Sequence, residues 1–215
     1  MIHFDYIRDP GEIERQSFVQ IRELADLSRF DPDQQQVAMR LIHTCGDPAI
    51  IDDLYFSEWA VQAGLEALHG GTAVLCDVEM VRQGLSRRYL DAPIHCFLNA
   101  QGIEEQARGT GETRSMAALA WWRPHLAGSI VAIGNAPTAL FRLLEMLAEG
   151  APRPALIIGM PVGFVGARES KQALLEVAPL QLGVPCITLS GRRGGSALTA
   201  ATVNALARMS RGIRF

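Results

Sequence analysis

Apolar residues recur every three or four positions through the first seventy residues, which is the spacing of one face of a helix. Asp9-Pro10 predicts the start of a first helix, because proline is well tolerated in the first helical turn. Asp31-Pro32 predicts a second helix that ends at Gly46-Asp47-Pro48, and a third runs from about Ser57 to His69. The face that we expect the first helix to turn towards the core holds residues spaced by four, four and three positions: Ile13, Ser17, Ile21 and Leu24.

Beyond residue 70, short apolar runs rich in β-branched residues alternate with stretches of helical pattern. The runs that we expect to be strands are 72–77, 93–99, 129–135, 154–160 and 184–190. This alternation predicts a parallel sheet with crossover helices. The chain shows no repeat, low-complexity segment or linker, so we expect one domain over residues 1–215, an α/β fold with a parallel β-sheet flanked by helices and a helical N-terminal region. Such sheets bind ligands outside the carboxyl ends of their strands.

Composition narrows the class of protein further. Hydrophobic residues make up 48% of the chain and charged residues 20%, as in ordinary globular proteins. The net charge of -3 argues against nucleic-acid binding by phosphate neutralisation. No apolar run reaches the roughly 20 residues that span a bilayer, and the charged start does not look like a secretory signal. The cysteines are widely spaced with no CxxC pair, which favours reduced thiols in a cytoplasmic protein over a metal site: Cys45, Cys76, Cys96 and Cys186.

His43 precedes the Gly46-Asp47-Pro48 turn in the segment RLIHTCGDP. The negative end of the helix dipole and the nearby Asp47 should raise the pKa of this imidazole, which would make it a usable general acid near neutral pH. A histidine that merely caps the end of its helix is the alternative, and the residues alone leave the choice open.

The loop IGNAPTAL follows the expected strand 129–135. Gly134 would let the backbone approach a ligand, the Asn135 side chain could cap the following helix, and Pro137 suits its first turn. A well-made strand-to-helix turn explains the same residues without any ligand.

The loop IGMPVGFVGARESK places Phe164 and Val165 between two glycines. Such an apolar loop could cover a large flat ligand, or it could be a dimer contact. The charged run 168–171 that follows is typical of a solvated helix face.

Arginines supply the remaining candidate chemistry. In SGRRGGS, Arg192 and Arg193 lie among glycines, where guanidinium groups and backbone amides suit carboxylate or phosphate, and Ser196 could cap the next helix. Neither GxxxxGK[ST] nor GxGxxG occurs, so a nucleotide cofactor is not supported. Arg114, in GTGETRS, lies at the positive end of a helix dipole, which indicates an anionic partner: either a ligand carboxylate or an acid such as Glu112.

Together, RLIHTCGD, the TRS of GTGETRS, IGNAPTAL, IGMPVGFVGARESK and SGRRGGS resemble, in order and spacing, the signature blocks of the precorrin-8X methylmutase family. The resemblance covers the chain from residues 17–18 to 204–206. It implies an isomerase of cobalamin biosynthesis that moves a ring methyl group of precorrin-8X from C11 to C12 and yields hydrogenobyrinate. It also implies a parallel α/β fold, no cofactor and no metal, and a homodimer with active sites near the subunit interface.

The same resemblance assigns His43 as the acid and places the substrate, a flat tetrapyrrole fringed by carboxylates, on residues of the matching blocks. These expected substrate-binding residues are Ser17, Arg114, Gly134, Asn135, Pro137, Thr138, Phe164, Val165, Arg192, Arg193 and Gly194. A corrinoid carrier that hands its ligand to the next biosynthetic enzyme, a mutase acting on cobalt-precorrin-8, and a generic binder of a carboxylated metabolite are the alternatives.

Overall fold

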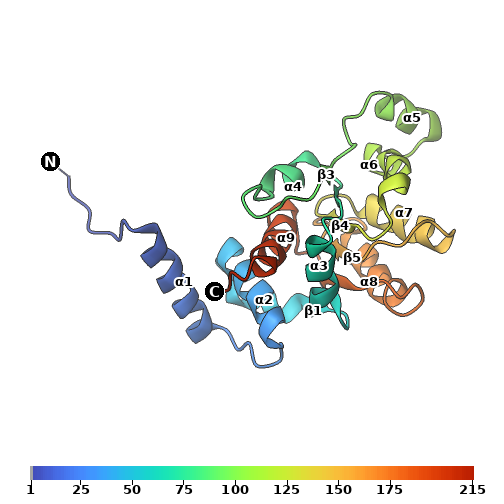
Figure 1. Cartoon of the computed structure of the whole chain (residues 1–215). Helices are drawn as coiled ribbons and strands as arrows, with labels where there is room; N and C mark the ends of the chain where they lie inside the picture. The colour runs from blue at the N-terminus through green and yellow to red at the C-terminus, as the bar shows by residue number, and fades with distance from the viewer. Residues whose placement is uncertain (1) are drawn as a thin grey trace.

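A six-stranded sheet in the order β1-β6-β5-β4-β2-β3 forms the centre of the computed structural model, which describes residues 2–215 (Figure 1). The strands are β1 Leu54–Phe56, β2 Val74–Cys76, β3 Ile94–His95, β4 Ile130–Ile133, β5 Leu156–Gly159 and β6 Cys186–Leu189. β2 to β6 run parallel, as the sequence predicts, and each is shorter than its predicted run.

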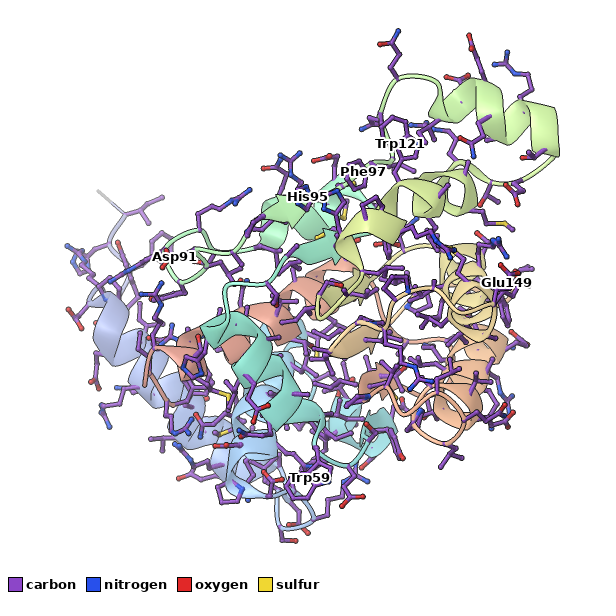
Figure 2. The ribbon with its side chains drawn as sticks, turned by 45° about the vertical axis from the view of Figure 1, so that its right-hand side comes forward. Trp59, Asp91, His95, Phe97, Trp121 and Glu149 are labelled. Atoms are coloured by element: carbon purple, nitrogen blue, oxygen red, sulfur yellow. The ribbon has the colours of Figure 1, made fainter. Side chains whose placement is uncertain are left out.

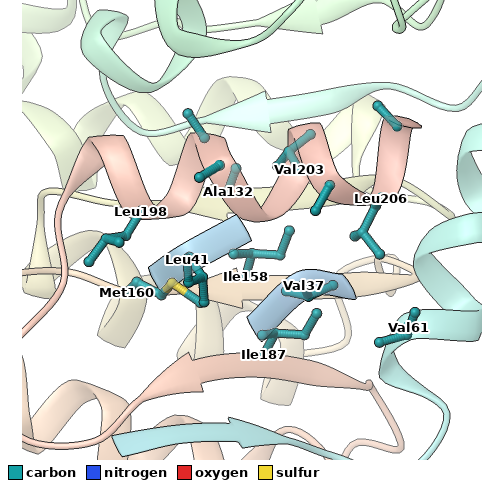
Figure 3. Close-up of a cluster of buried hydrophobic side chains, with 14 of the residues drawn as sticks. Val37, Leu41, Val61, Ala132, Ile158, Met160, Ile187, Leu198, Val203 and Leu206 are labelled. Atoms are coloured by element: carbon teal, nitrogen blue, oxygen red, sulfur yellow. The ribbon is translucent and has the colours of Figure 1, made fainter. Parts of the chain in front are cut away.

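Helices cover both faces of this sheet. The helices of the described residues are α1 Pro10–Leu24, α2 Pro32–Cys45, α3 Ala60–His69, α4 Glu79–Gly84, α5 Ile103–Thr110, α6 Arg114–Ala118, α7 Pro137–Ala148, α8 Ala167–Val177 and α9 Ser196–Ser210, with 3₁₀ segments η1 Pro48–Asp53 and η2 Leu119–His125. On one face α2, α3, α4 and α9 enclose the larger core, and on the other η2, α7 and α8 enclose the second. Figure 3 shows Val37 and Leu41 of α2 and Val203 of α9 packed over Ile158 and Ile187 of the sheet. None of the helices among residues 2–215 is long and apolar enough to cross a membrane.

The N-terminal region is not helical throughout, since it contains β1. The sequence did not predict this strand. β1 pairs antiparallel with β6, with Leu54 opposite Leu189, so the sheet is mixed rather than wholly parallel. Ser57 prolongs this pairing: its amide donates to the Cys186 carbonyl at 2.9 Å, and its hydroxyl accepts from the Cys186 amide at 2.8 Å. The third helix therefore begins at Ala60 instead of Ser57.

Helix α1 starts where predicted, with the Asp9 carboxylate accepting from the Glu12 amide at 2.7 Å. Its predicted core-side face is wrong at two positions, because Ile13 and Leu24 are 45% and 69% exposed. The helix instead packs through Phe18, whose ring lies 4.1 Å from that of Phe215, centroid to centroid. The segment before α1 extends away from the sheet (Figure 1).

Strand order creates a switch point between β2 and β4. The chain leaves β2 for β3 on one side and then returns to place β4, β5 and β6 on the other. Crossover connections leave in opposite directions there, which opens the crevice where doubly wound proteins bind ligands. The loops predicted to carry function follow β4, β5 and β6 at this carboxyl edge.

Candidate active site at the carboxyl edge of the sheet

Asp77 holds the loop after β4 in place at the switch point. This residue was not among the candidates predicted from the sequence. It follows β2, is 2% exposed, and its carboxylate accepts from the amides of Gly134, Asn135 and Ala136 at 3.0, 2.8 and 2.9 Å. Burial raises the pKa of the Asp77 carboxyl, while the three amides favour its ionised form. Because this carboxylate fills the concave backbone at the start of α7, the predicted Asn135 cap is wrong, and α7 has no side-chain cap. The signal in the sequence was an aspartate directly after a buried apolar strand.

Gly134 is required for packing, which the sequence reading did not foresee. A Cβ atom there would lie 2.8 Å from Thr199 Oγ1 and 2.9 Å from both Ser196 Cα and Val81 Cγ2. The start of α9 thus lies directly against this strand end, and the Gly134 amide is already bound to Asp77. Pro137 occupies the first turn of α7, as predicted, and the Asn135 side chain is exposed.

Arg114 lies beside this loop at the first position of α6. Its guanidinium donates to Asn99 Oδ1 at 2.6 Å and to the Leu98 carbonyl at 3.2 Å, so its partners lie after β3 and not at Glu112. The preceding residue, Thr113, caps α6 and shares a 2.9 Å hydroxyl contact with Thr138 of α7. This contact brings the Arg114 segment against the loop after β4.

The loops after β4, β5 and β6, together with the Arg114 segment, form a rim along the carboxyl edge of the sheet. Phe164 and Val165 are the most solvent-exposed apolar side chains of this rim, 88% and 89% exposed. The Arg192 guanidinium carbon lies 5.9 Å from the centroid of the Phe164 ring. On the other side, a Cβ on Gly166 would lie 3.3 Å from Pro137 Cβ. The apolar loop after β5 therefore lies between the loops after β4 and β6, and it is open to a ligand or a partner.

The loop after β6 is held closely against the loop after β5. Gly195 donates to the Met160 carbonyl at 2.8 Å, and any side chain on Gly194 would collide with that carbonyl. Ser196 is the first residue of α9 and does not cap it, because Gly195 occupies the capping position; that prediction is wrong. Arg193 forms an ion pair with Asp47 and lies 3.7 Å from Asp53, nitrogen to oxygen.

His43 lies in the last turn of α2, where it is exposed although its ring stacks on Phe18 at a centroid distance of 5.2 Å, which covers part of the imidazole. Burial lowers the pKa of His43, the Arg40 guanidinium lowers it further, and Glu14 opposes both. The predicted upward shift is therefore wrong. Arg40 precedes His43 by three residues, which is one helical turn, and Asp47 pairs with Arg193 instead of supporting the imidazole.

Ser17 precedes the Phe18 ring that stacks on His43, but its hydroxyl donates to the Ile13 carbonyl of its own helix at 2.7 Å. No hydrogen bond or ion pair within residues 2–215 joins Ser17 or His43 to the loops of the rim. The connection to the rim runs through the turn after α2, where Asp47 meets Arg193.

An aromatic cluster lies at the end of the edge strand β3, as Figure 2 shows for His95, Phe97 and Trp121. The rings of His95 and His125 stack at 4.5 Å, and Phe97 lies 5.6 Å from His95 and 6.0 Å from Trp121, all between ring centroids. Burial lowers the pKa of His95, and His125 and Arg82 add to the shift. Within residues 2–215, no group of three or more His, Cys, Asp or Glu side chains is placed to hold a metal ion.

The fold and this rim define a doubly wound α/β protein with arginines, glycine-rich loops and an apolar loop along the carboxyl edge of its sheet. A sequence model of the family described as precorrin-8X methylmutase matches residues 12–209. The chain is 54% identical over 205 residues to precorrin-8X methylmutase from Pseudomonas aeruginosa, covering 94% of this chain and 97% of that protein. It is 50% identical over 210 residues to precorrin-8X methylmutase from Sinorhizobium sp, covering 97% of this chain and 99% of that one.

A structure described as precorrin-8x methyl mutase from Thermus thermophilus superposes with a TM-score of 0.84 at 38% identity, covering 94% of this chain and 98% of that one. The chain belongs to the precorrin-8X methylmutase family, which comprises isomerases of cobalamin biosynthesis, as its sequence blocks predict. The same comparisons confirm the predicted α/β fold class.

Proposed function

We propose that this enzyme moves the ring methyl group of precorrin-8X from C11 to C12, giving hydrogenobyrinate, with His43 as the general acid. The observation that carries this proposal is the rim itself. Along one edge of the sheet it places the Arg114 and Arg192 guanidinium groups and the apolar Phe164 loop, with the turn after His43 at its end. A flat tetrapyrrole fringed by carboxylates requires an apolar surface bordered by cations.

The chemistry needs a proton more than a nucleophile. A methyl shift around a conjugated macrocycle is favoured when protonation of a ring nitrogen biases the electronics of the ring. A positioned general acid typically contributes about 10²–10⁴-fold in rate. Burial and Arg40 lower the pKa of His43 in the free chain, and carboxylates of a bound substrate act in the opposite direction. A bound substrate would therefore raise the pKa of His43 and favour the protonated imidazole that donates the proton.

Each rim residue has a proposed part in binding. Arg114 and Arg192 would bind substrate carboxylates, Phe164 and Val165 would cover the ring, and Asp77 would hold the segment 134–138 in place beside it. Arg193 would act mainly by fixing the loop that carries Arg192 and Gly194, because Asp47 and Asp53 already engage its guanidinium. Ser17 would contact the substrate from α1.

Identity with the relatives supports the metal-free substrate. Those named precorrin-8X methylmutase are 54% and 50% identical to the chain, whereas cobalt-precorrin-8 methylmutase from Priestia megaterium is 36% identical over 200 residues, covering 92% of this chain and 87% of that protein. The four free cysteines support a reducing, cytoplasmic setting.

A homodimer completes the proposal. Ile13 and Leu24 lie on the same face of α1 as Ser17 and are exposed, as are Phe164 and Val165 on the rim. A second subunit covering these apolar side chains would also enclose the ligand, which the open rim of one chain does not.

The experiment that tests the function incubates wild type and His43→Ala with excess precorrin-8X while the absorption spectrum is followed. We expect many product equivalents per wild-type active site, and a His43→Ala enzyme that binds corrinoid without converting it. A spectral change that stops at one equivalent would identify a carrier that holds its ligand for the next enzyme. Full activity of His43→Ala would overturn the acid role, and a faster reaction with cobalt-precorrin-8 would reassign the substrate.

A further inference from the structure

Lys171 is the only lysine in the chain; all the other residues that make up the Lys and Arg total are arginines. Its side chain is 1% exposed in the second turn of α8, although the charged run 168–171 predicts a solvated face. Arg168 and Glu169 do face solvent. Lysine is almost never fully buried unless it is paired, so this position requires a structural or functional reason.

The partner of Lys171 is the arginine loop after β6. Its Nζ donates to the Arg193 carbonyl oxygen at 2.5 Å, so the lysine holds the backbone of this loop. Burial lowers the pKa of Lys171 to about 8, and the Asp53 carboxylate acts in the opposite direction. A hydrogen bond from an ammonium group is stronger than one from a neutral amine.

Arg193 links this loop to the turn that follows His43. Its guanidinium pairs with Asp47 and approaches Asp53 to 3.7 Å. Asp47 also accepts from the Ala49 amide at 3.0 Å, and Asp53 accepts from the Ser190 hydroxyl at 3.0 Å. Two cations and two carboxylates thus join α8, the loop after β6 and the segment between α2 and β1.

We propose that Lys171 is a positioning residue for the reaction: by holding the Arg193 carbonyl, it fixes the loop that bears Arg192 and Arg193 against the turn that follows His43. This inference rests on the proposed function of the site. Gly191, Gly194 and Gly195 all have positive φ, a conformation that glycine adopts without strain. The position of this loop therefore depends on its contacts, of which the Lys171 hydrogen bond is one and the bond from the Gly195 amide to the Met160 carbonyl is another. A lysine ammonium group is a compact point charge that suits a single carbonyl acceptor, whereas the guanidinium fork of arginine matches a pair of oxygen atoms.

The first test needs no corrinoid. Protein labelled with [ε-¹³C]lysine gives one lysine resonance, which we expect to titrate with a midpoint at about pH 8. The amide signals of Gly194 and Gly195 should shift with the same midpoint in wild type and lose that step in Lys171→Met. Asp53 raises the pKa of Lys171, so Asp53→Asn should move the midpoint lower, and this variant also serves if Lys171→Met does not fold.

The second test measures turnover of precorrin-8X and spectral titration with hydrogenobyrinate. We expect Lys171→Met to lose on the order of 10-fold in kcat/KM, because small misplacements of catalytic groups are costly. Wild-type affinity should fall as the pH rises through about 8, since the ammonium group is then lost, and the variant should lack this step. Arg108→Met is the matched control: it also replaces one cation by methionine, at an exposed ion pair 3.0 Å from Glu104, and should behave as wild type.

Glycine amides that do not follow the lysine titration would overturn the inference. So would a folded Lys171→Met enzyme with wild-type kcat/KM and an unchanged pH step. A wild-type protein without turnover would instead count against the proposed function, and the glycine amides would still show whether Lys171 holds the loop.

Discussion

At the scale of single residues, burial and Arg40 lower the pKa of His43, and Glu14 of another helix acts in the opposite direction. Arg40 of α2 and Arg208 of α9 lie 3.4 and 3.1 Å from the Glu14 carboxylate of α1. Burial and the Arg40 guanidinium together outweigh the Glu14 carboxylate, which favours the neutral imidazole. The sequence shows the helix end but not which distant residues meet there.

The first prediction concerns this balance. Arg40→Met should raise the pKa of His43, because a cation that lowers it is removed, and Glu14→Gln should lower it. The folded-state pKa of His43 lies below its usual value, so the contribution of His43 to stability is present above that usual value and is lost as the pH falls through the folded-state pKa. Titration of the imidazole proton resonance by NMR measures both shifts. Equal pKa values in both variants would show that burial alone determines the shift.

A second prediction at this scale concerns Asp77. Asp77→Asn removes a buried charged acceptor from three amides and should lower the free energy of unfolding by about 2–3 kcal/mol. Denaturant unfolding measures the loss, and affinity for hydrogenobyrinate should fall with it, because the loop 134–138 loses its anchor. Asp91→Asn, at an exposed pair with Arg211, is the control and should cost about 0.5 kcal/mol or less. A loss of stability at Asp77 without any loss of affinity would remove the loop from the binding site.

At the scale of elements, the sequence predicts the strands and helices that follow strong local rules. Proline starts α1, α2 and α7 as expected, and five apolar runs become parallel strands. β1 escaped prediction because three residues show no periodicity, and its strand state depends on pairing with β6, more than 130 positions further along. Pairing that comes from distant chain segments is invisible in a local pattern.

The sequence predicted which loops form the candidate site, but not which residues contact one another there. The loops after β4, β5 and β6 were placed correctly, because carboxyl ends of parallel strands share an edge. Asn135 and Ser196 were predicted to cap α7 and α9, and neither does. At Gly134, predicted to let the backbone approach a ligand, the structure shows the close approach of α9 and a hydrogen bond to the buried Asp77 carboxylate. Capping rules consider only near neighbours, so they could not identify Asp77 as the residue that satisfies these amides.

The loop after β6 leads to a prediction that separates its two arginines. Arg192 contacts the Phe164 ring and is exposed, so Arg192→Ala should weaken corrinoid binding and change the free energy of unfolding by about 0.5 kcal/mol or less. Arg193→Ala breaks the pairs with Asp47 and Asp53, so it should lower both stability and kcat. Spectral titration, denaturant unfolding and turnover distinguish the two variants. The opposite assignment of effects would make Arg193 the ligand contact.

At the scale of the whole molecule, α1 is the least enclosed of the long helices. Phe18 and Ile21 are its buried residues, while Ile13, Val19 and Leu24 are exposed. Ile13 and Leu24 share one face with Ser17, and Val19 lies on a different face, as the helical repeat of 100° per residue requires. A single chain therefore leaves the apolar side of this face in water, next to a residue expected to bind substrate.

The last prediction follows from that face. Leu24→Asp should convert the proposed dimer into monomers, because a carboxylate buried without a partner at an interface is strongly unfavourable. Light scattering coupled to size exclusion measures the mass, and turnover should fall together with it if the second subunit helps to enclose the substrate. Val19→Asp adds the same charge to the same helix on another face and should leave the dimer intact. Dimers that survive Leu24→Asp would place the interface elsewhere, with the exposed Phe164 and Val165 as the next surface to test, whereas active monomers would show that one chain encloses the substrate unaided.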